Sequence, residues 1–121
     1  MGIHSHSQGP QAISASPFKH GLSYNEVFGT KEGGTPLTAG LFDITQSDSV
    51  NFVYPGDEFL YIISGEVHLE DEDKKEVTKL KAGDIGHIQK GTRTKWSTPS
   101  QGKGFWVSQK EHGASLHEHT Y

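Results

Sequence analysis

Residues 57–67 read DEFLYIISGEV, and this stretch is the most informative part of the sequence for the fold. Every position from Phe59 to Ile63 is apolar, whereas a strand with one face in water alternates apolar and polar residues. A short continuous apolar run indicates a central β-strand that is covered on both faces. Glu58 lies at the start of this otherwise apolar strand, so its carboxyl group is a candidate functional group.

Short apolar runs continue on both sides of this stretch. Glycine and proline recur at short intervals, and the runs between them are rich in the residues that favour strands. No apolar pattern of helical period persists beyond a turn or two. The expected strands are Leu37–Thr45, Val50–Tyr54, Glu58–Ser64, Glu66–Glu70, Glu76–Leu80, Ile85–Gln89, Thr94–Ser97 and Gly104–Ser108. About eight short strands predict an all-β fold, a closed barrel or a jelly roll.

The length of 121 residues corresponds to a single domain. We expect the barrel to occupy residues 17–109. Residues 1–16 are polar and are interpreted as a flexible or edge-pairing N-terminal arm, and residues 110–121 as a polar C-terminal tail.

Composition argues against several classes of protein. The formal net charge is −4, from 11 basic and 15 acidic residues, whereas nucleic-acid binders carry a basic stripe. The longest apolar stretch, Phe59 to Ile63, is far shorter than the roughly 20 residues of a membrane-spanning helix. Cysteine is absent, which excludes disulfides, thiolate zinc sites and thiol nucleophiles. We therefore expect a cytoplasmic protein that binds neither nucleic acid nor membrane.

Two segments resemble the two sequence motifs of the cupin family. Glu58 followed by Gly65 fits the E-x6-G end of the first motif, G-x5-H-x-H-x3/4-E-x6-G. Gly83 and Gly91 fit the glycines of the second, G-x5-P-x-G-x2-H-x3-N, with Gln89 where proline is usual. The resemblance covers about residues 36–108 and implies a single cupin jelly-roll barrel.

Within the cupins, two longer runs resemble the small single-domain proteins of the EutQ type. These are D-E-F-x-Y-I-x-x-G-E-V at residues 57–67 and K-G-x-x-x-x-W-x-T-P at residues 90–99. EutQ-type cupins are ethanolamine-utilisation-like and related to the ureidoglycine-aminohydrolase-like cupins. The resemblance also implies a homodimer, since small cupins often pair through their N-terminal strands.

The histidine ligands of the cupin metal site are replaced in this sequence. The positions of the first-motif histidines fall on Phe52 and Tyr54, or on Asn51 and Val53 with the shorter spacing, and that of the second-motif histidine falls on Thr94. A first-row divalent ion needs three or four nitrogen or oxygen donors that converge on one point. We therefore expect no metal at this site and no other cofactor. The small EutQ-type cupins, which this chain resembles, also lack the metal.

Glu58 is the first candidate for catalysis, because the resemblance places it in the barrel lumen. A buried carboxylate either pairs with a cation or has its pKa raised by desolvation, and a pKa near neutrality suits a general acid or base. The alternative is a structural carboxylate that is hydrogen-bonded to Tyr54 or to a neighbouring strand. Tyr54 is a second catalytic candidate, as a hydrogen-bond donor to substrate or as the acid/base partner of Glu58.

Other side chains are expected to line a substrate site. The resemblance places Phe52, Thr94 and Trp96 inward, where the indole would form an aromatic wall or a cation–π surface, unless the rings simply fill the barrel. Asp43 and Tyr61 complete the expected substrate-binding set, although a hydrogen bond at a strand edge is the alternative role for Asp43.

His87 is the third catalytic candidate, because it interrupts the apolar residues of the expected strand Ile85–Gln89. If its face is lumenal, His87 and Glu58 form an acid/base couple or the core of a rebuilt metal site; otherwise it is an ordinary core or surface histidine. The pairs His4-x-His6 and His117-x-His119 have metal-like spacing but lie in polar termini.

The sequence thus predicts an enzyme with metal-independent acid/base catalysis on a small polar or carbonyl metabolite. The reaction would be of the isomerase, dehydratase, lyase or cyclase type, with Glu58 as proton carrier and Tyr54 and His87 assisting. One alternative is a non-catalytic, EutQ-like ligand-binding or accessory protein. The other is a metal-dependent cupin enzyme with Glu58, His87 and a terminal histidine as non-standard ligands.

Overall fold

The computed structural model describes residues 3, 17–19, 21–30, 36–46 and 49–110. Regular secondary structure in these ranges consists of strands, and they contain no helix of the length and apolarity needed to cross a membrane. The predicted N-terminal arm, apart from residue 3, and the predicted tail, apart from Lys110, lie outside the described residues.

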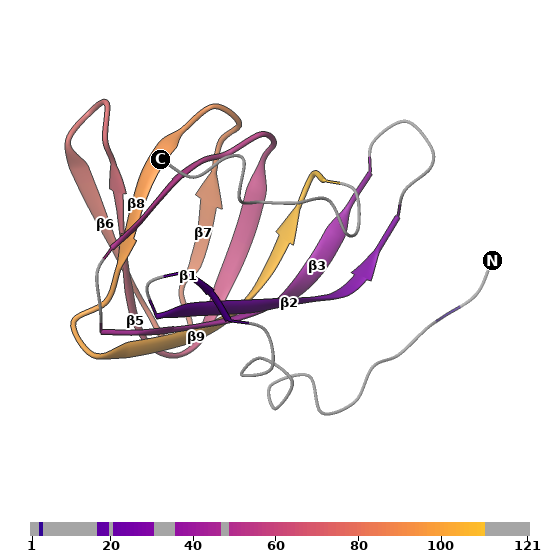
Figure 1. Ribbon diagram of the computed structural model, residues 1–121, viewed down its shortest axis with the longest axis horizontal. Helices are drawn as coiled ribbons and strands as arrows, with labels where there is room; N and C mark the ends of the chain where they lie inside the picture. Colours follow the sequence, from indigo (N-terminus) through magenta and orange to yellow (C-terminus); the bar gives the residue numbers. More distant parts are fainter. Residues whose placement is uncertain (1–2, 4–16, 20, 31–35, 47–48, 111–121) are drawn as a thin grey trace.

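The described strands form one antiparallel sheet that curls around the protein interior (Figure 1). Neighbours follow the order β1-β2-β3-β9-β5-β8-β4, and β6 and β7 each pair with β5. The strands are β1 (Pro17–Lys19), β2 (Leu22–Gly29), β3 (Thr38–Thr45), β4 (Val50–Val53), β5 (Glu58–Asp71), β6 (Glu76–Lys81), β7 (Ile85–Ile88), β8 (Arg93–Ser97) and β9 (Gln101–Ser108). The expected all-β barrel architecture is confirmed.

Strand β5 holds the two parts of the sheet together. Its first part pairs with β7 and β9, and its second part with β6 and β8. We expected two strands separated by a turn at Gly65, but the chain continues because a bulge between Ile62 and Ser64 bends the strand without ending it. Gly65 has φ +76°, and a Cβ atom there would lie 2.1 Å from the carbonyl oxygen of Gln101, so glycine alone fits this bend.

Two strands were not expected from the sequence. Both β1 and β2 precede the expected first strand, and β2 pairs along most of β3. The alternation of Leu22 and Tyr24 with polar residues is the signal that could have found β2, but the charged Glu26 interrupts it at the next inward position.

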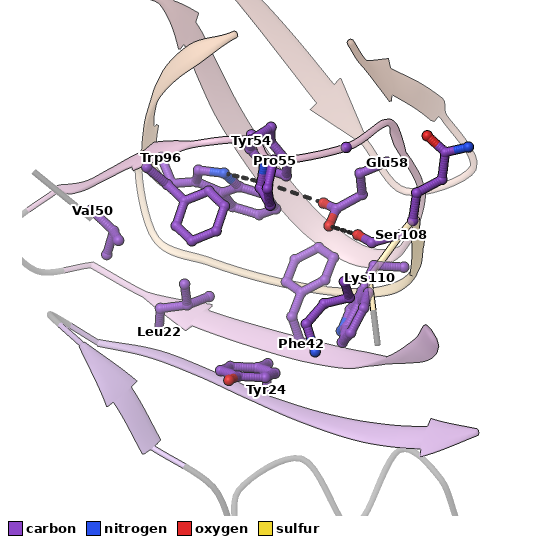
Figure 2. A pocket seen from close by; sticks show the side chains of 14 residues that line it. Leu22, Tyr24, Phe42, Val50, Tyr54, Pro55, Glu58, Trp96, Ser108 and Lys110 are labelled. Carbon is purple, nitrogen blue, oxygen red and sulfur yellow. Dashed lines mark hydrogen bonds between the residues drawn. The ribbon is translucent and has the colours of Figure 1, made fainter. Parts of the chain in front are cut away.

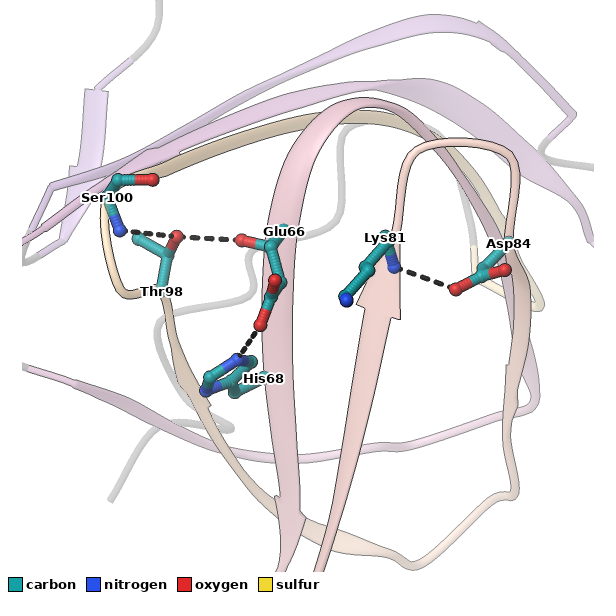
Figure 3. A network of polar contacts seen from close by, with 6 residues as sticks. All are labelled: Glu66, His68, Lys81, Asp84, Thr98 and Ser100. Carbon is teal, nitrogen blue, oxygen red and sulfur yellow. Dashed lines mark hydrogen bonds and ion pairs between the residues drawn. The ribbon is translucent and has the colours of Figure 1, made fainter.

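Side-chain hydrogen bonds fix the turns around the second part of β5 (Figure 3). The hydroxyl of Thr98 donates to the backbone oxygen of Glu66 at 2.7 Å and accepts from the backbone N–H of Ser100 at 3.3 Å. On the other side, the carboxylate of Asp84 accepts from the backbone N–H of Lys81 at 2.8 Å. These contacts satisfy backbone groups that the strand ladders leave unpaired.

The two faces of β5 differ in exposure. Its inward side chains, which include Leu60 and Ile62, are buried in the core, whereas Phe59, Tyr61 and Ile63 on the outer face are 50%, 43% and 43% exposed. The expectation that both faces are covered is therefore wrong for this chain, because no described element packs over the outer face. The expected homodimer concerns a second chain and stays a prediction.

Adjacent isoleucines of β5 provide a matched test of this difference. Ile62 is fully buried and Ile63 is 43% exposed. We expect Ile62→Ala to lower the free energy of unfolding by about 2–5 kcal/mol, because it leaves a cavity in the core. Ile63→Ala should cost less than about 1 kcal/mol, as is usual for exposed positions. Equal losses in urea unfolding would contradict the assignment of the two faces.

Candidate functional site

An apolar cavity of about 60 Å³ lies inside the curled sheet (Figure 2). Its walls come from β2, β3, β4, β8 and β9, from the loop between β4 and β5, and from the start of β5. Both tryptophans of the chain line it, together with two tyrosines and two phenylalanines. Glu58 is the carboxylic acid in this wall.

The carboxyl group of Glu58 is held by two hydroxyl groups from different parts of the chain. Glu58 begins β5 and lies directly opposite Ser108 in the pairing of β5 with β9. The Ser108 hydroxyl donates to Oε1 of Glu58 at 2.5 Å, and the Tyr54 hydroxyl donates to Oε2 at 3.1 Å. Glu58 as a residue is only 7% exposed, and both of its carboxyl oxygens have a donor.

Trp96 determines the orientation of the Tyr54 hydroxyl. The indole Nε1–H of Trp96, on β8, donates to the Tyr54 hydroxyl oxygen at 3.0 Å. Because an indole nitrogen can only donate, the phenol oxygen must accept, and its own proton is directed to Glu58. The backbone of Tyr54 is fixed too, by hydrogen bonds with Thr92 and Gly91 at 3.1 and 2.8 Å. Trp96, Tyr54 and Glu58 thus form an oriented chain of hydrogen bonds.

Burial changes the acidity of both acidic groups in this chain. Desolvation raises the pKa of Glu58 to about 7, and the hydrogen bonds from Ser108 and Tyr54 oppose this rise. Burial, with the nearby Glu58 charge, raises the pKa of Tyr54 well above 10. Glu58 can therefore change its protonation state near neutral pH, whereas Tyr54 stays a neutral phenol.

One partner of an ion pair lies in the wall of the same cavity. Lys110, which follows β9, lines the cavity, and its ammonium group contacts the carboxylate of Glu26 on β2. The Thr38 hydroxyl donates to the backbone oxygen of Lys110 at 2.9 Å. The assignment of Lys110 to a polar tail is therefore wrong, because the residue is buried and belongs to the barrel.

Sequence reasoning missed Ser108, Lys110 and Glu26 as residues of the site. Alternation along β9 would place Ser108 on the same face as Trp106, but it cannot tell which strand lies opposite. Lys110 and Glu26 are 84 positions apart in the sequence, and no local pattern connects them.

Three expected residues do line the cavity. Phe52, Tyr54 and Trp96 are buried and lie in its wall, and the rings of Phe52 and Tyr54 meet edge-to-face with centroids 4.8 Å apart. The prediction that these rings face the lumen with Glu58 is confirmed. Their roles toward a substrate stay predictions.

Three other expectations about site residues are wrong in their placement. His87 lies on the outer face of the sheet, where its ring stacks on Phe59 with centroids 4.6 Å apart, so it is not beside Glu58. Tyr61 lies on this outer face as well. Asp43 alternates with the inward residues Phe42 and Ile44 of β3 and is not part of the cavity wall. Each of these three side chains alternates with inward residues of its own strand and therefore points away from the lumen.

Thr94 is buried as expected but lies outside the aromatic cavity. Its hydroxyl donates to the backbone oxygen of Phe52 at 2.9 Å, and it lines a second, more polar cavity of about 260 Å³. Acidic residues of β5 and β6, among them Glu70 and Glu76, also line this second cavity. Glu58 is not among its residues.

The donor set at the motif positions does not fit a metal ion. Phe52 has no donor atom in its side chain, and the hydroxyls of Tyr54 and Thr94 are used in hydrogen bonds. Glu58 alone offers a carboxylate there, and among the described residues no three His, Cys, Asp or Glu side chains are grouped closely enough to hold an ion. His4, His6, His117 and His119 lie outside the described residues.

The sequence model of the EutQ-like cupin domain matches residues 30–101. The chain belongs to this family of cupins. No protein of curated function matches the sequence. Solved structures show the cupin fold, and the chain spans only 64% of the length of the Clostridium difficile EutQ protein, to which it is 18% identical over 75% of its own length, with a TM-score of 0.66.

Two further solved structures are similar to this EutQ-like cupin. The EutQ protein of Salmonella typhimurium is 23% identical, with a TM-score of 0.65, over 75% of this chain and 71% of that one. The ectoine synthase of P. lautus is 18% identical, with a TM-score of 0.76, over 98% of this chain and 88% of that one. At these identities the similarity shows the fold alone.

The raised pKa of Glu58 predicts how stability depends on pH. Its pKa rises from 4.5 in the unfolded chain to about 7 in the folded protein, so the folded state binds more protons between these values. Stabilisation by protonated Glu58 is therefore complete below about pH 4.5 and is lost as the pH rises through 7, by roughly 3 kcal/mol in total. We expect this loss between pH 5 and 8 in urea unfolding of the wild type, measured relative to Glu58→Gln. Parallel pH curves for the two proteins would contradict the burial of an ionisable carboxyl group.

Removal of the Tyr54 hydroxyl should raise the pKa of Glu58 further. Its hydrogen bond lowers the pKa of this carboxyl group, so Tyr54→Phe removes a contact that favours the charged form. The measurement is the pH titration of the Glu58 carboxyl carbon by ¹³C NMR. Tyr61→Phe, which removes a hydroxyl on the outer face, is the control and should leave the titration unchanged. A lower pKa in Tyr54→Phe would show that the phenol does not donate to the carboxylate.

Proposed function

We propose that this EutQ-like cupin is an enzyme that moves a proton to or from a small metabolite in its lumen, with Glu58 as the proton carrier. The observation that carries the proposal is a buried carboxyl group with a pKa near 7 beside an apolar cavity. At neutral pH such a group populates its acid and base forms together, which is the condition for efficient general acid/base catalysis.

The contacts of Glu58 leave it room to react. A carboxylate has about four lone-pair positions, and the hydroxyls of Ser108 and Tyr54 use one position on each oxygen. The remaining positions can accept a proton from a bound metabolite and return it. Tyr54 and Ser108 act as positioning residues, because their hydrogen bonds fix the carboxyl group while both stay neutral.

The reactions that fit are those in which Glu58 removes a proton from the substrate and then delivers it, either to another atom of the substrate or to a leaving group. In an isomerisation, Glu58 would take a proton from one atom of the substrate and return it to another. In a dehydration, or in a cyclisation that expels water, Glu58 would take a proton from the substrate and deliver it to the hydroxyl group whose C–O bond breaks, so that the two leave as water. The ectoine synthase of P. lautus has this fold, so the fold is one that is used by an enzyme. His87 has no part in the proposal, because its ring lies on the opposite face of the sheet.

A non-catalytic, ligand-binding protein is the second candidate. The hydrogen bonds to both oxygens of Glu58 favour it, since they also suit a structural carboxyl group. In that case a metabolite would bind in the lumen and leave unchanged.

The test is proton exchange from solvent. Chelator-treated wild-type protein is incubated in D₂O with a filtered metabolite extract, and mass spectrometry records which compounds gain deuterium or change mass. We expect Glu58→Gln to slow this conversion by roughly 100-fold or more, as for the loss of a general acid/base. The control is Glu76→Gln, which removes an exposed carboxyl group from the second cavity and should convert the compound at the wild-type rate.

Other outcomes separate the alternatives. Equal rates for Glu58→Gln and the wild type would remove Glu58 from the mechanism. Activity that disappears on chelation and returns with metal would establish the metal-dependent alternative. A metabolite that is retained by the protein but never converted would establish the non-catalytic one.

A further inference from the structure

The charges and rings of the lumen indicate the chemical class of its ligand. We propose that the cavity binds small organic cations, with an alkylammonium group held between the Glu58 carboxylate and the aromatic side chains of the wall. The inference rests on the proposed function only in using the same cavity, since binding does not require that Glu58 transfers a proton.

The balance of charge in the cavity wall favours a cation. The ammonium group of Lys110 contacts the carboxylate of Glu26, so this pair adds no net charge. The donors that hold Glu58 are the neutral hydroxyls of Ser108 and Tyr54. Among the described residues that line the cavity, an ionised Glu58 is therefore a negative charge without a cationic partner, which a cationic ligand would neutralise.

The cavity wall is rich in aromatic rings. The chain contains two tryptophans, four tyrosines and six phenylalanines, and six of these twelve side chains line the cavity. They form three edge-to-face pairs, Tyr24 with Trp106, Phe42 with Trp96, and Phe52 with Tyr54. The electron-rich faces of aromatic rings attract cations, so a wall with this many rings favours a cationic group over an anionic one.

Other ligand classes fit this wall less well. A carboxylate or phosphate would approach Glu58, which repels it when ionised, and would compete with Glu26 for Lys110. A neutral apolar ligand would remove water from Glu58 and supply no compensating charge. The cavity of about 60 Å³ limits the ligand to a few non-hydrogen atoms or to one end of a longer molecule.

Binding of a cation should depend on pH through Glu58. The described groups that face its carboxyl are the hydroxyls of Tyr54 and Ser108; Lys110 lies in the same wall, with its ammonium group against Glu26. A cation favours the ionised carboxylate, so its affinity should rise with pH up to the pKa of Glu58 and then level off. An anion would show the opposite dependence.

The test compares three probes of similar size, n-propylammonium, n-propanol and propionate. The readout is the pair of indole N–H signals in ¹H–¹⁵N NMR spectra, because the two tryptophans of the chain both line the cavity. We expect n-propylammonium to shift the Trp96 signal saturably, with an affinity at pH 8 several-fold to tenfold higher than at pH 6. Propanol and propionate should give no saturable shift over the same concentrations.

Two variants locate the binding. Glu58→Gln keeps the size of the side chain but removes its charge, and should weaken n-propylammonium binding about tenfold or more. Glu76→Gln removes a carboxyl group of the more acidic second cavity and should leave the affinity unchanged.

Three results would overturn the proposal. These are tighter binding of propionate than of n-propylammonium, absence of a saturable shift with n-propylammonium at pH 8, and loss of binding in Glu76→Gln but not in Glu58→Gln. If one of them occurs while Glu58→Gln still abolishes deuterium exchange, the proton carrier stands and only the ligand class is wrong. If n-propylammonium binds as expected but Glu58→Gln leaves the deuterium exchange unchanged, the ligand class stands and Glu58 is not the proton carrier.

Discussion

The burial of one carboxyl group constrains how the strands around the lumen meet. A carboxyl group removed from water must find hydrogen-bond donors in the protein, and Glu58 finds them in Ser108 of β9 and in Tyr54 after β4. A shift of the β5–β9 register by one residue would turn Ser108 to the outer face. This register also requires a small residue on β9. A Cβ atom at Gly104 would lie 2.4 Å from the ring of Phe42, which is too close for any residue but glycine.

The nature of the donors matters as much as their number. A basic partner would favour the ionised form of Glu58 and lower its pKa, as opposite charges do. Lys110 lies in the same cavity wall, but its ammonium group contacts Glu26. Desolvation therefore remains the largest influence on Glu58, and its pKa stays near neutrality. The buried ion pair between β2 and the end of β9 thus keeps the cation of the cavity apart from the acid that the proposed reaction uses.

Patterns within single strands predicted much of the fold and part of the site. Alternation showed which side chains share a face, because side-chain direction in a strand is a local property, and the resemblance to cupins then placed Tyr54 and Trp96 on the lumenal face. The same rule could not decide the lumenal face of β7, where neighbouring positions are mostly apolar, so the sequence left the face of His87 open, and the structure places it on the outer one. Tyr61 was placed in the site from a strand that is apolar on both faces, and its own face is the outer one. Ser108 was missed because its role depends on pairing between distant strands, which no local pattern contains.

The replacement of the motif histidines changes what kind of positive charge the barrel can hold. Imidazole nitrogens with a carboxylate form a ligand set for a metal ion, whereas the rings of Phe52 and Tyr54 have no donor available for one. Aromatic faces still favour positive charge, but over a broad surface and without directed bonds. Together with the Glu58 carboxylate, such a wall suits a diffuse organic cation better than a small, strongly hydrated ion, which must exchange its water for oxygen or nitrogen ligands. The retained glutamate and the aromatic substitutions are therefore consistent with each other as parts of one binding site.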